Sequence, residues 1–346
     1  MTKVAKNVFV GMSGGVDSSV SAALLKEQGY VVTGVYMKNW SQDLPGFACP
    51  WKEDYQDAKR VAVQLGIPLK LYDFEKEYRQ KVVDYMIAEY QAGRTPNPDI
   101  MCNQEVKFKL FLETALEDGA DLIATGHYAR SKDRQLLAGL DDNKDQSYFL
   151  YRVTEDALQK SLMPIGEMKK PAVRALAKKL GLATADKKDS QGICFVGKVG
   201  IKEFLLSQLG AQPEGPIIDQ TGKEIGRHDG AIFYTIGQRH GLDVGGGLPY
   251  YVSRKDVKAN TIYVTTDLND TALWTGAVKL EDTHWINGKP DEKKRYKARL
   301  RYRGPLVDCT LQGDTLTLAE EQRGLATGQS AVMYDNGRVL GGGIIS

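Results

Sequence analysis

A stretch near the N-terminus, VFVGMSGGVDSSV at residues 8–20, constrains the fold of this 346-residue chain more than any other feature. An apolar strand ending at Met12 is followed by a serine- and glycine-rich run and then by residues with helical spacing. Such a strand–turn–helix gathers backbone N–H groups and a helix N-terminus around one point, an arrangement that binds phosphate. An isolated Ser-Gly-Gly indicates no more than a turn with a helix cap. The flanking strand and helix instead favour a nucleotide site.

The loop lacks the lysine of G-x-x-x-x-G-K-[ST] and does not match G-x-G-x-x-G. Transfer of a γ-phosphate by a loop lysine is therefore not expected. Asp17 beside the loop suggests a different use of the triphosphate, in which a carboxylate helps to hold a magnesium ion against the phosphates.

Alternating strand and helix patterns fill the first half of the chain and predict a doubly wound parallel-sheet α/β domain over residues 1–198. From about residue 211 the chain becomes rich in Gly, Pro and short alternating runs, among them AIFYTIG at 231–237. These runs predict a small β-rich domain over 199–269 and a C-terminal β-barrel over 270–346.

Composition excludes several classes of protein. No stretch of about 18 consecutive apolar residues is present, so we expect a soluble, cytoplasmic protein without a membrane partner. The net charge of +2 is too small to indicate nucleic-acid binding, although it is compatible with a local basic surface. The four cysteines, Cys49, Cys102, Cys194 and Cys309, are far apart and form no C-x-x-C pair, so the sequence suggests neither a zinc site nor a dense disulfide framework.

Cys102 follows a proline-stiffened loop within RTPNPDIMCNQEVKFKLF, residues 94–111. We expect it at the start of an amphipathic helix, with Asn103 as the cap and Lys107 and Lys109 on the following turns. That setting predicts a lowered thiol pKa and a nucleophilic thiolate. Taken alone, such a cysteine is more often a small buried apolar residue.

Two further side chains fit chemistry with Cys102. Asp99 lies three residues earlier and is placed to exchange a proton with a substrate in the same loop. Cys194 lies in the lysine-flanked segment KKDSQGICFVGK, residues 187–198, and a second reactive thiol suits sulfur relay. Cys309 is expected to pack inside a strand, whereas Cys49 is ambiguous.

The segment KKRYKARLRYR, residues 293–303, carries a cation at every second position. In a strand this period places the cations on one face and the apolar residues on the other, so the pattern favours contact with RNA phosphates. A solvated strand face is the alternative. The alternating cations are Lys293, Arg295, Lys297, Arg299, Arg301 and Arg303.

Nine motifs in order resemble those of the bacterial tRNA-specific 2-thiouridylase family, within the ATP pyrophosphatase (PP-loop) superfamily, over nearly the whole chain: GMSGGVDSS, YMKNW, NPDIMCN, TGHYAR, NKDQSYFL, SQGICF, TIGQRHGL, RYRG and GGGII. The resemblance implies adenylation of the C2 oxygen of the wobble uridine of tRNA, followed by sulfur transfer from a cysteine persulfide. One departure is Gln191 in SQGICF, where Thr is more usual.

The resemblance also implies roles for individual residues. Cys194 carries the persulfide, Cys102 is the partner nucleophile, and Asp99 is the acid or base. The target base is expected to contact Asn97, Pro98 and Asp99. The residues implied for ATP are Gly11, Met12, Ser13, Gly14, Gly15, Val16, Asp17, Ser18, Met37 and Gly126. Those implied for tRNA are His127, Lys144, Asp145, Gln146, Arg301, Tyr302 and Gln329.

The expected substrates are ATP with Mg²⁺ and the anticodon stem-loop of tRNA, and a desulfurase or carrier protein is expected to supply persulfide sulfur. No permanently bound cofactor is expected, and no side chain other than Asp17 is a candidate metal ligand. The scheme requires Cys102 and Cys194 to converge on the mouth of the loop. Two alternatives stay open: another AMP-forming PP-loop ligase or amidotransferase acting on a small molecule, and a non-catalytic RNA-binding protein.

Overall fold

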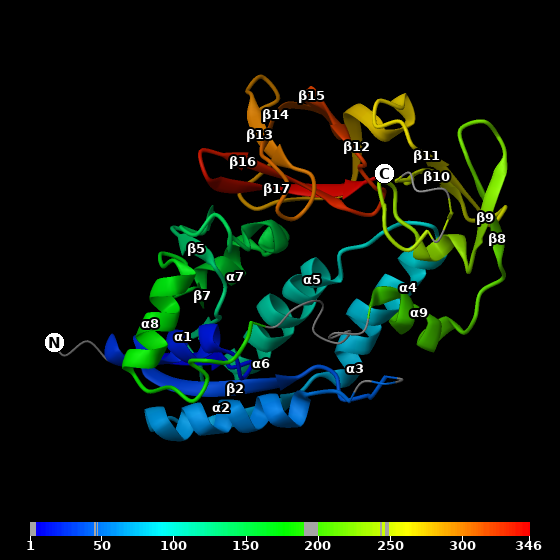
Figure 1. Cartoon of the computed structure of the whole chain (residues 1–346). Coiled ribbons are helices and arrows are strands. Elements are labelled where there is room, and N and C mark those ends of the chain that lie inside the picture. Colours follow the sequence, from blue (N-terminus) through cyan, green and yellow to red (C-terminus); the bar gives the residue numbers. More distant parts are fainter. Residues whose placement is uncertain (1–4, 45, 47, 190–199, 243, 246–248) are drawn as a thin grey trace.

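The structure is a computed structural model that describes residues 5–44, 46, 48–189, 200–242, 244–245 and 249–346. Figure 1 shows three parts: an α/β domain, a β-barrel lying over it, and a smaller sheet to one side. None of the helices in the described part of the chain has the length and apolar character needed to cross a bilayer.

The α/β domain is built on a parallel sheet with strand order β3-β2-β1-β4-β7. Its strands are β1 (Asn7–Gly11), β2 (Val31–Lys38), β3 (Leu69–Asp73), β4 (Leu122–Ala124) and β7 (Ser161–Leu162). Side chains alternate across β1, because Val8 and Val10 belong to one buried cluster and Phe9 to another. The central strands are thus covered on both faces, as the doubly wound prediction requires.

Helices cover the two faces. One face packs against α1 (Val16–Glu27), α2 (Trp51–Leu65) and α8 (Lys170–Lys179). The other packs against two longer helical stretches, each with a π-helical segment. The first runs through α3 (Glu75–Tyr78), Arg79–Val83 and α4 (Asp84–Gln91); the second runs through α5 (Pro98–Met101), Cys102–Leu110 and α6 (Phe111–Glu117).

A hairpin and two short helical segments follow β4. The hairpin consists of β5 (Ala129–Lys132) and β6 (Gln135–Ala138), and β6 pairs with β17 of the barrel. The helical segments are a 3-10 turn, Ser147–Leu150, and α7 (Glu155–Gln159). The α/β domain therefore extends the barrel sheet, which the sequence pattern did not predict.

The middle of the chain forms α9 (Ile201–Leu209) and a four-stranded sheet of order β10-β11-β8-β9. Its strands are β8 (Gly215–Ile218), β9 (Glu224–His228), β10 (Tyr251–Asp256) and β11 (Thr261–Thr265). The strand predicted for AIFYTIG is wrong, because Ala231–Phe233 forms a 3-10 turn. Four consecutive residues, 231–234, are buried there, and a strand exposed on one face cannot bury successive side chains.

The C-terminal part is a closed antiparallel barrel of order β12-β15-β14-β13-β16-β17, in which β12 also pairs with β17. The strands are β12 (Trp274–Trp285), β13 (Tyr296–Arg299), β14 (Val307–Gln312), β15 (Thr315–Arg323), β16 (Ser330–Asp335) and β17 (Arg338–Ile345), with a 3-10 turn at Thr271–Leu273. The barrel prediction is confirmed. Cys309 packs inside it, and burial raises the pKa of this thiol to about 12.

Candidate nucleotide and thiol site

The serine-glycine loop joins β1 to α1 as predicted. Gly15 is the N-cap of α1 and supplies no side chain to cap the first N–H groups of the helix. The hydroxyls of Ser18 and Ser19 instead bond the Gly15 carbonyl at 3.1 and 2.8 Å, and the Ser13 N–H donates to Ser18 Oγ at 3.2 Å. The serines thus hold the turn in shape, while the helix N-terminus stays suited to an anion.

Two glycines allow the tight packing of this loop. Gly14 has φ +72°, and a Cβ added there would lie 2.3 Å from the Asp54 carbonyl oxygen. Gly126, just after β4, packs so closely that an added Cβ would lie 2.8 Å from the Ser18 nitrogen. Met37 on β2 packs against Gly11, because the Met37 Cε would lie 2.9 Å from a Cβ added at Gly11. The structure therefore brings the residues predicted for ATP together from three neighbouring strands.

A network of charges surrounds Asp17 on the first turn of α1. Lys170 Nζ lies 2.8 Å from both carboxylate oxygens of Asp17, and the Tyr128 hydroxyl donates to one of them at 2.8 Å. Burial and the nearby carboxylate raise the pKa of Tyr128, so its hydroxyl stays a donor. Neither partner was predicted, because a lysine and a tyrosine 153 and 111 positions away in sequence carry no local signal.

The network continues to Asp189. Its carboxylate bonds Lys170 at 2.8 Å, Lys144 at 2.7 Å and Arg174 at 2.5 Å. Partial burial favours a higher pKa for Asp189, but hydrogen bonds from Lys144 and Lys170 outweigh it and lower the pKa to about 2. Lys144, predicted to contact tRNA, is therefore engaged with a carboxylate in this state.

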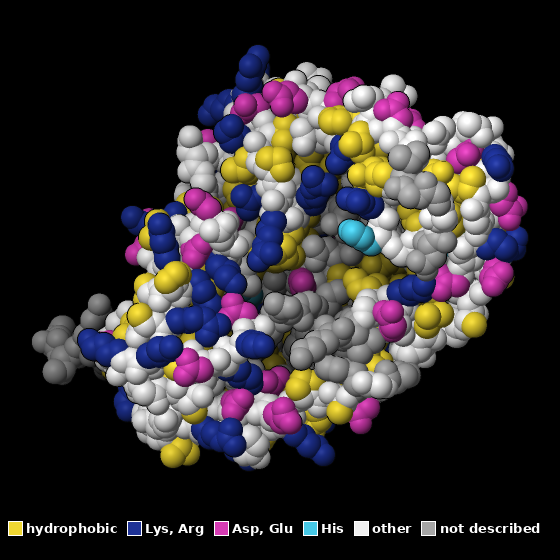
Figure 2. Space-filling model, viewed as in Figure 1, with side chains coloured by type: hydrophobic (Ala, Val, Ile, Leu, Met, Phe, Trp, Pro, Cys, Tyr) yellow, Lys and Arg dark blue, Asp and Glu magenta, His cyan; other side chains and the backbone are white. Residues whose placement is uncertain are grey.

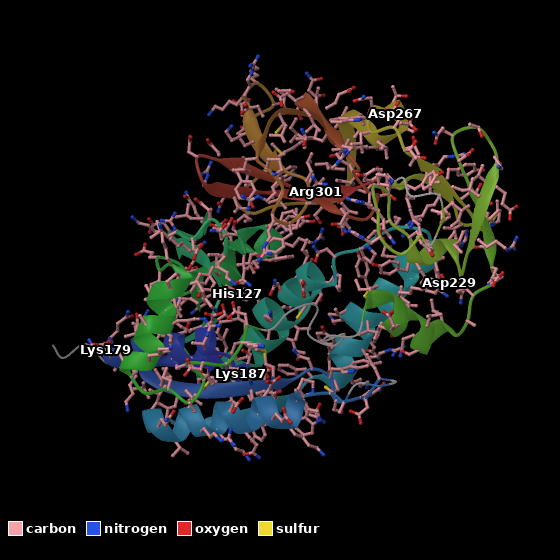
Figure 3. All side chains as sticks on the ribbon, viewed as in Figure 1. His127, Lys179, Lys187, Asp229, Asp267 and Arg301 are labelled. Carbon is pink, nitrogen blue, oxygen red and sulfur yellow. The ribbon has the colours of Figure 1, made fainter. Side chains whose placement is uncertain are left out.

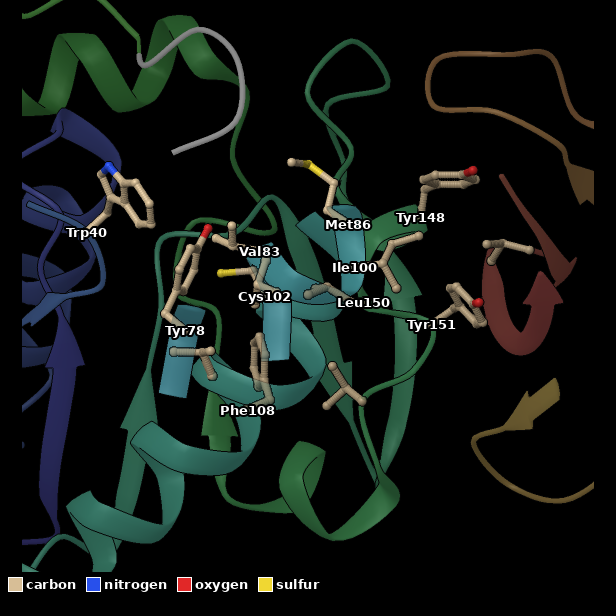
Figure 4. Packing of buried hydrophobic residues seen from close by; sticks show 14 of the residues in the cluster. Trp40, Tyr78, Val83, Met86, Ile100, Cys102, Phe108, Tyr148, Leu150 and Tyr151 are labelled. Atoms are coloured by element: carbon tan, nitrogen blue, oxygen red, sulfur yellow. The ribbon is translucent and has the colours of Figure 1, made fainter. Parts of the chain in front are cut away.

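Cys102 lies one turn further into its helix than predicted. The helix begins at Pro98 after the N-cap Asn97, and the sulfur of Cys102 is buried among apolar side chains, as Figure 4 shows. Burial raises its pKa and Lys107 only partly opposes this, so the prediction of a lowered pKa is wrong. Asn103 is not the cap either, because its amide donates to the Phe149 carbonyl at 3.2 Å.

Asp99 precedes Cys102 by three residues in the same helical stretch, so the two side chains share a face. Burial raises the pKa of Asp99, with Lys107 as the opposing charge. The Asp99 carboxylate in turn contributes to the raised pKa of Cys102. An acid whose pKa moves toward neutrality is suited to exchanging protons with a substrate.

Cys194 and its motif lie outside the described residues. The last described residue before this motif is Asp189. Lys187, two positions earlier, bonds Asp54 and Asp57 at 2.7 and 2.6 Å. Of the remaining cysteines, Cys49 has its sulfur 3.6 Å from the Trp40 carbonyl oxygen, and burial raises its pKa.

Three residues predicted to contact tRNA lie close together and bond to groups of the protein itself. His127 is buried, its Nδ1 lies 2.8 Å from Thr125 Oγ1, and burial lowers its pKa well below the usual value. Asp145 is buried and accepts bonds from Ser147 and Gly139. Gln146 accepts a bond from the Tyr128 N–H at 3.0 Å. In this state their polar groups hold the protein's own turns together.

The basic segment follows the predicted alternation only in part. Tyr296, Ala298 and Leu300 are buried and the intervening cations are not, but strand β13 ends at Arg299. Arg299 forms an ion pair at 2.9 Å with buried Asp145 of the α/β domain. The sequence pattern predicted that this cation faces phosphate and did not predict the ion pair. An ion pair with a buried carboxylate is stronger than a pair between exposed groups, and only the folded structure reveals the partner.

Beyond β13, Arg301 is exposed and lies on the side of the barrel that faces the α/β domain, as Figure 3 shows. Tyr302 packs against Phe149 with ring centroids 4.3 Å apart and the ring planes tilted by 47°. Gln329 donates from its amide to the Thr95 carbonyl at 2.8 Å. Figure 2 shows lysine and arginine side chains on both sides of a hollow between the α/β domain and the barrel.

Family models match each part of the chain. The match covers a tRNA methyl transferase HUP domain at residues 6–198, a tRNA methyl transferase PRC-barrel domain at 202–266 and an aminomethyltransferase beta-barrel domain at 275–345. These three models define a HUP-domain protein of the tRNA methyl transferase type with two appended β domains.

Full-length relatives are more specific. The chain is 49% identical to a tRNA-specific 2-thiouridylase of Geobacillus kaustophilus and 49% identical to one of Pseudomonas aeruginosa, in each case over 98% of this chain and 94% of the relative. The chain belongs to the tRNA-specific 2-thiouridylase family. A solved complex of a 4-thiouridine synthetase with RNA and ATP is 19% identical, with a TM-score of 0.39 over 59% of this chain and 50% of that chain.

Proposed function

We propose that this protein is an ATP-dependent tRNA-uridine 2-sulfurtransferase that converts the wobble uridine of tRNA to 2-thiouridine in the cytoplasm. The observation that carries the proposal is that one domain holds both an anion-binding loop without a lysine and an Asp–Cys pair on one helical turn. Full-length identity to tRNA-specific 2-thiouridylases supports the same reaction.

The first step activates the base. The C2 oxygen of uridine attacks the α-phosphate of ATP, the bond to the β-phosphate breaks, and pyrophosphate leaves. The residues predicted for ATP cradle the triphosphate, with backbone N–H groups at the start of α1 facing it. Asp99 takes the N3 proton of the base as the C2 oxygen becomes a nucleophile, and its raised pKa suits this exchange. Asn97 and Pro98, just before it, contact the base.

Magnesium accompanies the triphosphate. Asp17 is a partly exposed carboxylate at the loop, and carboxylate oxygens together with phosphate oxygens are the usual ligands of Mg²⁺. The ion neutralises charge on the phosphates when bound. The protein's own part is to present the Asp17 carboxylate in an orientation held by the Tyr128 hydroxyl.

The second step transfers sulfur. The terminal sulfur of a persulfide on Cys194 adds to C2, and AMP leaves with the former C2 oxygen. The Cys102 thiol then loses its proton as its sulfur attacks the Cys194 sulfur, the persulfide S–S bond breaks, and its electron pair stays on the sulfur bound to C2. Asp99 returns its proton to N3. A Cys102–Cys194 disulfide results, and a thiol reductant returns both cysteines to the reduced state. A persulfide-carrying protein reloads Cys194.

Chain length is compatible with this convergence. Cys194 lies five residues after Asp189, and five residues span at most roughly 18 Å. Asp189 is bonded to Lys170, which also bonds Asp17 on the loop. This end of the described chain therefore lies beside the proposed nucleotide site, and Cys194 itself is outside the described residues.

tRNA is proposed to bind in the hollow between the barrel and the α/β domain. The anticodon loop would lie near Arg301 and Tyr302, with the other predicted tRNA residues deeper in the site. The wobble base leaves its stack to reach Asp99, at a cost of a few kcal/mol that is smallest for an unpaired base.

The test is mass spectrometry of the wobble nucleoside after incubation of the protein with unmodified tRNA, Mg²⁺, ATP and a persulfide donor. We expect 2-thiouridine, AMP and pyrophosphate in equal amounts, with Cys194→Ser still adenylating but not thiolating. ATP consumption that does not depend on tRNA would instead indicate a small-molecule ligase. Absence of ATP consumption would indicate a binding protein.

A further inference from the structure

The anion loop at residues 13–18 carries no lysine, yet the pyrophosphate that leaves in the proposed reaction is highly charged. Backbone N–H groups and the start of α1 supply only partial positive charge. A cation must come from elsewhere in the fold, and among the described residues Lys170 is the one whose ammonium is bonded to the loop's own acid, Asp17.

Lys170 is held where a phosphate-binding cation would be needed. It begins α8, its backbone N–H donates to the Asp141 carboxylate at 2.8 Å, and only 8% of its surface is exposed. Its Nζ lies 2.8 Å from both Asp17 oxygens. A charge shielded from water interacts more strongly with a neighbouring phosphate than a surface lysine does.

The surrounding pairs let this ammonium change partners without leaving a carboxylate unpaired. Asp189 keeps its bonds to Lys144 and Arg174 if Lys170 moves away. Asp17 keeps the bond from the Tyr128 hydroxyl and is free to face a magnesium ion. Exchanging Asp17 for a phosphate oxygen therefore replaces one anion by another at the same ammonium.

We propose that Lys170 supplies the phosphate-binding cation that the loop lacks, exchanging Asp17 for the β- and γ-phosphates of ATP and staying with pyrophosphate as it leaves. This inference rests on the proposed AMP-forming reaction and names the group that stabilises its leaving group. Lys170 touches the substrate in this scheme, so it is a catalytic residue.

The experiment compares Lys170→Gln with Lys178→Gln by calorimetric titration with three probes: Mg²⁺ plus inorganic pyrophosphate, Mg·ATP, and AMP. Lys178 lies on the same helix and pairs with Asp186 on the surface, which makes it a matched control. Since a charge-assisted phosphate contact is lost, Lys170→Gln should weaken pyrophosphate and ATP binding roughly tenfold while AMP binding stays within about twofold. Lys178→Gln should change none of the three.

Pyrophosphate affinity that is unchanged in Lys170→Gln, or AMP affinity that falls as much as ATP affinity, overturns the inference. If Lys170→Gln does not fold, Lys170→Gln with Asp189→Asn removes one charge of each sign, and the same titrations decide. Lys170→Arg, which keeps the charge, should recover most of the pyrophosphate affinity. Thiolation by the unaltered protein tests the proposed function separately, so the two failures are distinguishable.

Discussion

The amide of Gln329 in the barrel donates a hydrogen bond to the carbonyl of Thr95, 234 positions earlier in the chain, at 2.8 Å. The N–H of Thr95 donates to the Thr327 carbonyl at 2.8 Å, and its hydroxyl lies 3.1 Å from that of Thr235 in the middle domain. All three domains meet at this residue. Because Thr95 stands four positions before Asp99, the barrel helps to position the loop that leads into the helix carrying the proposed acid.

Gln329→Ala should slow thiolation at saturating tRNA while leaving tRNA affinity within about twofold. Losing one hydrogen bond of about 1 kcal/mol predicts a rate roughly fivefold lower if the loop is held less firmly. Single-turnover kinetics and filter binding measure the two quantities. Gln220→Ala, on the surface of the middle domain, is the control. Weaker tRNA binding with an unchanged rate would instead make Gln329 a direct tRNA contact.

Cys102 should react slowly with iodoacetamide in the free protein. Burial raises its pKa, so the thiolate fraction at pH 7.5 is smaller than for an ordinary cysteine, and it grows only as the pH rises past the usual thiol range. Peptide mass spectrometry should show alkylation at least roughly tenfold slower than in guanidinium-unfolded protein. Equal rates in the folded and unfolded chains would contradict the burial of the sulfur.

Arg299→Ala should destabilise the protein by roughly 3–5 kcal/mol, because it leaves the buried Asp145 carboxylate without its ion-pair partner. Lys297→Ala is the matched control, since its pair with Asp308 is exposed and should matter by less than about 1 kcal/mol. Denaturant unfolding followed by circular dichroism measures both. Equal, small losses would contradict a stabilising role for the Arg299–Asp145 ion pair.

Arg301→Ala should weaken tRNA binding and reduce the slope of log affinity against log salt by roughly 0.7–0.9, the value for one phosphate contact. Affinities at several salt concentrations give the slope. Arg227→Ala, which removes an exposed cation that pairs with two glutamates on β9 and before β8, should leave it unchanged. A slope that does not move in Arg301→Ala removes this residue from the RNA interface.

Asp189→Asn should cost stability in a pH-dependent way. The folded pKa is about 2 against an ordinary 3.8, so the carboxylate stabilises the fold above about pH 4, and this contribution is lost as the pH falls through 2. The difference in unfolding free energy from the unaltered protein should be roughly 1–2 kcal/mol at pH 6 and should shrink toward zero near pH 2. A difference independent of pH would point to packing instead of charge.

Much of the architecture could be predicted from local pattern. The strand, glycine turn and α1 form as expected because their spacing and backbone requirements are local. The buried alternation of Tyr296, Ala298 and Leu300 follows from the two-residue period of a strand. The strand predicted for AIFYTIG is wrong because an apolar run has the same sequence pattern in a tight turn as in a strand.

The sequence by itself determined the fold class, the anion loop and the residue types available for the chemistry, since these depend on period, turn conformation and the side chains present. Only the tertiary structure decided the charge states and partners. It buried Cys102 and reversed the expected direction of its pKa, paired Arg299 with Asp145, and brought Lys170 to Asp17 across 153 positions. Burial and charge pairing depend on which distant segments pack together, and no local pattern carries that information.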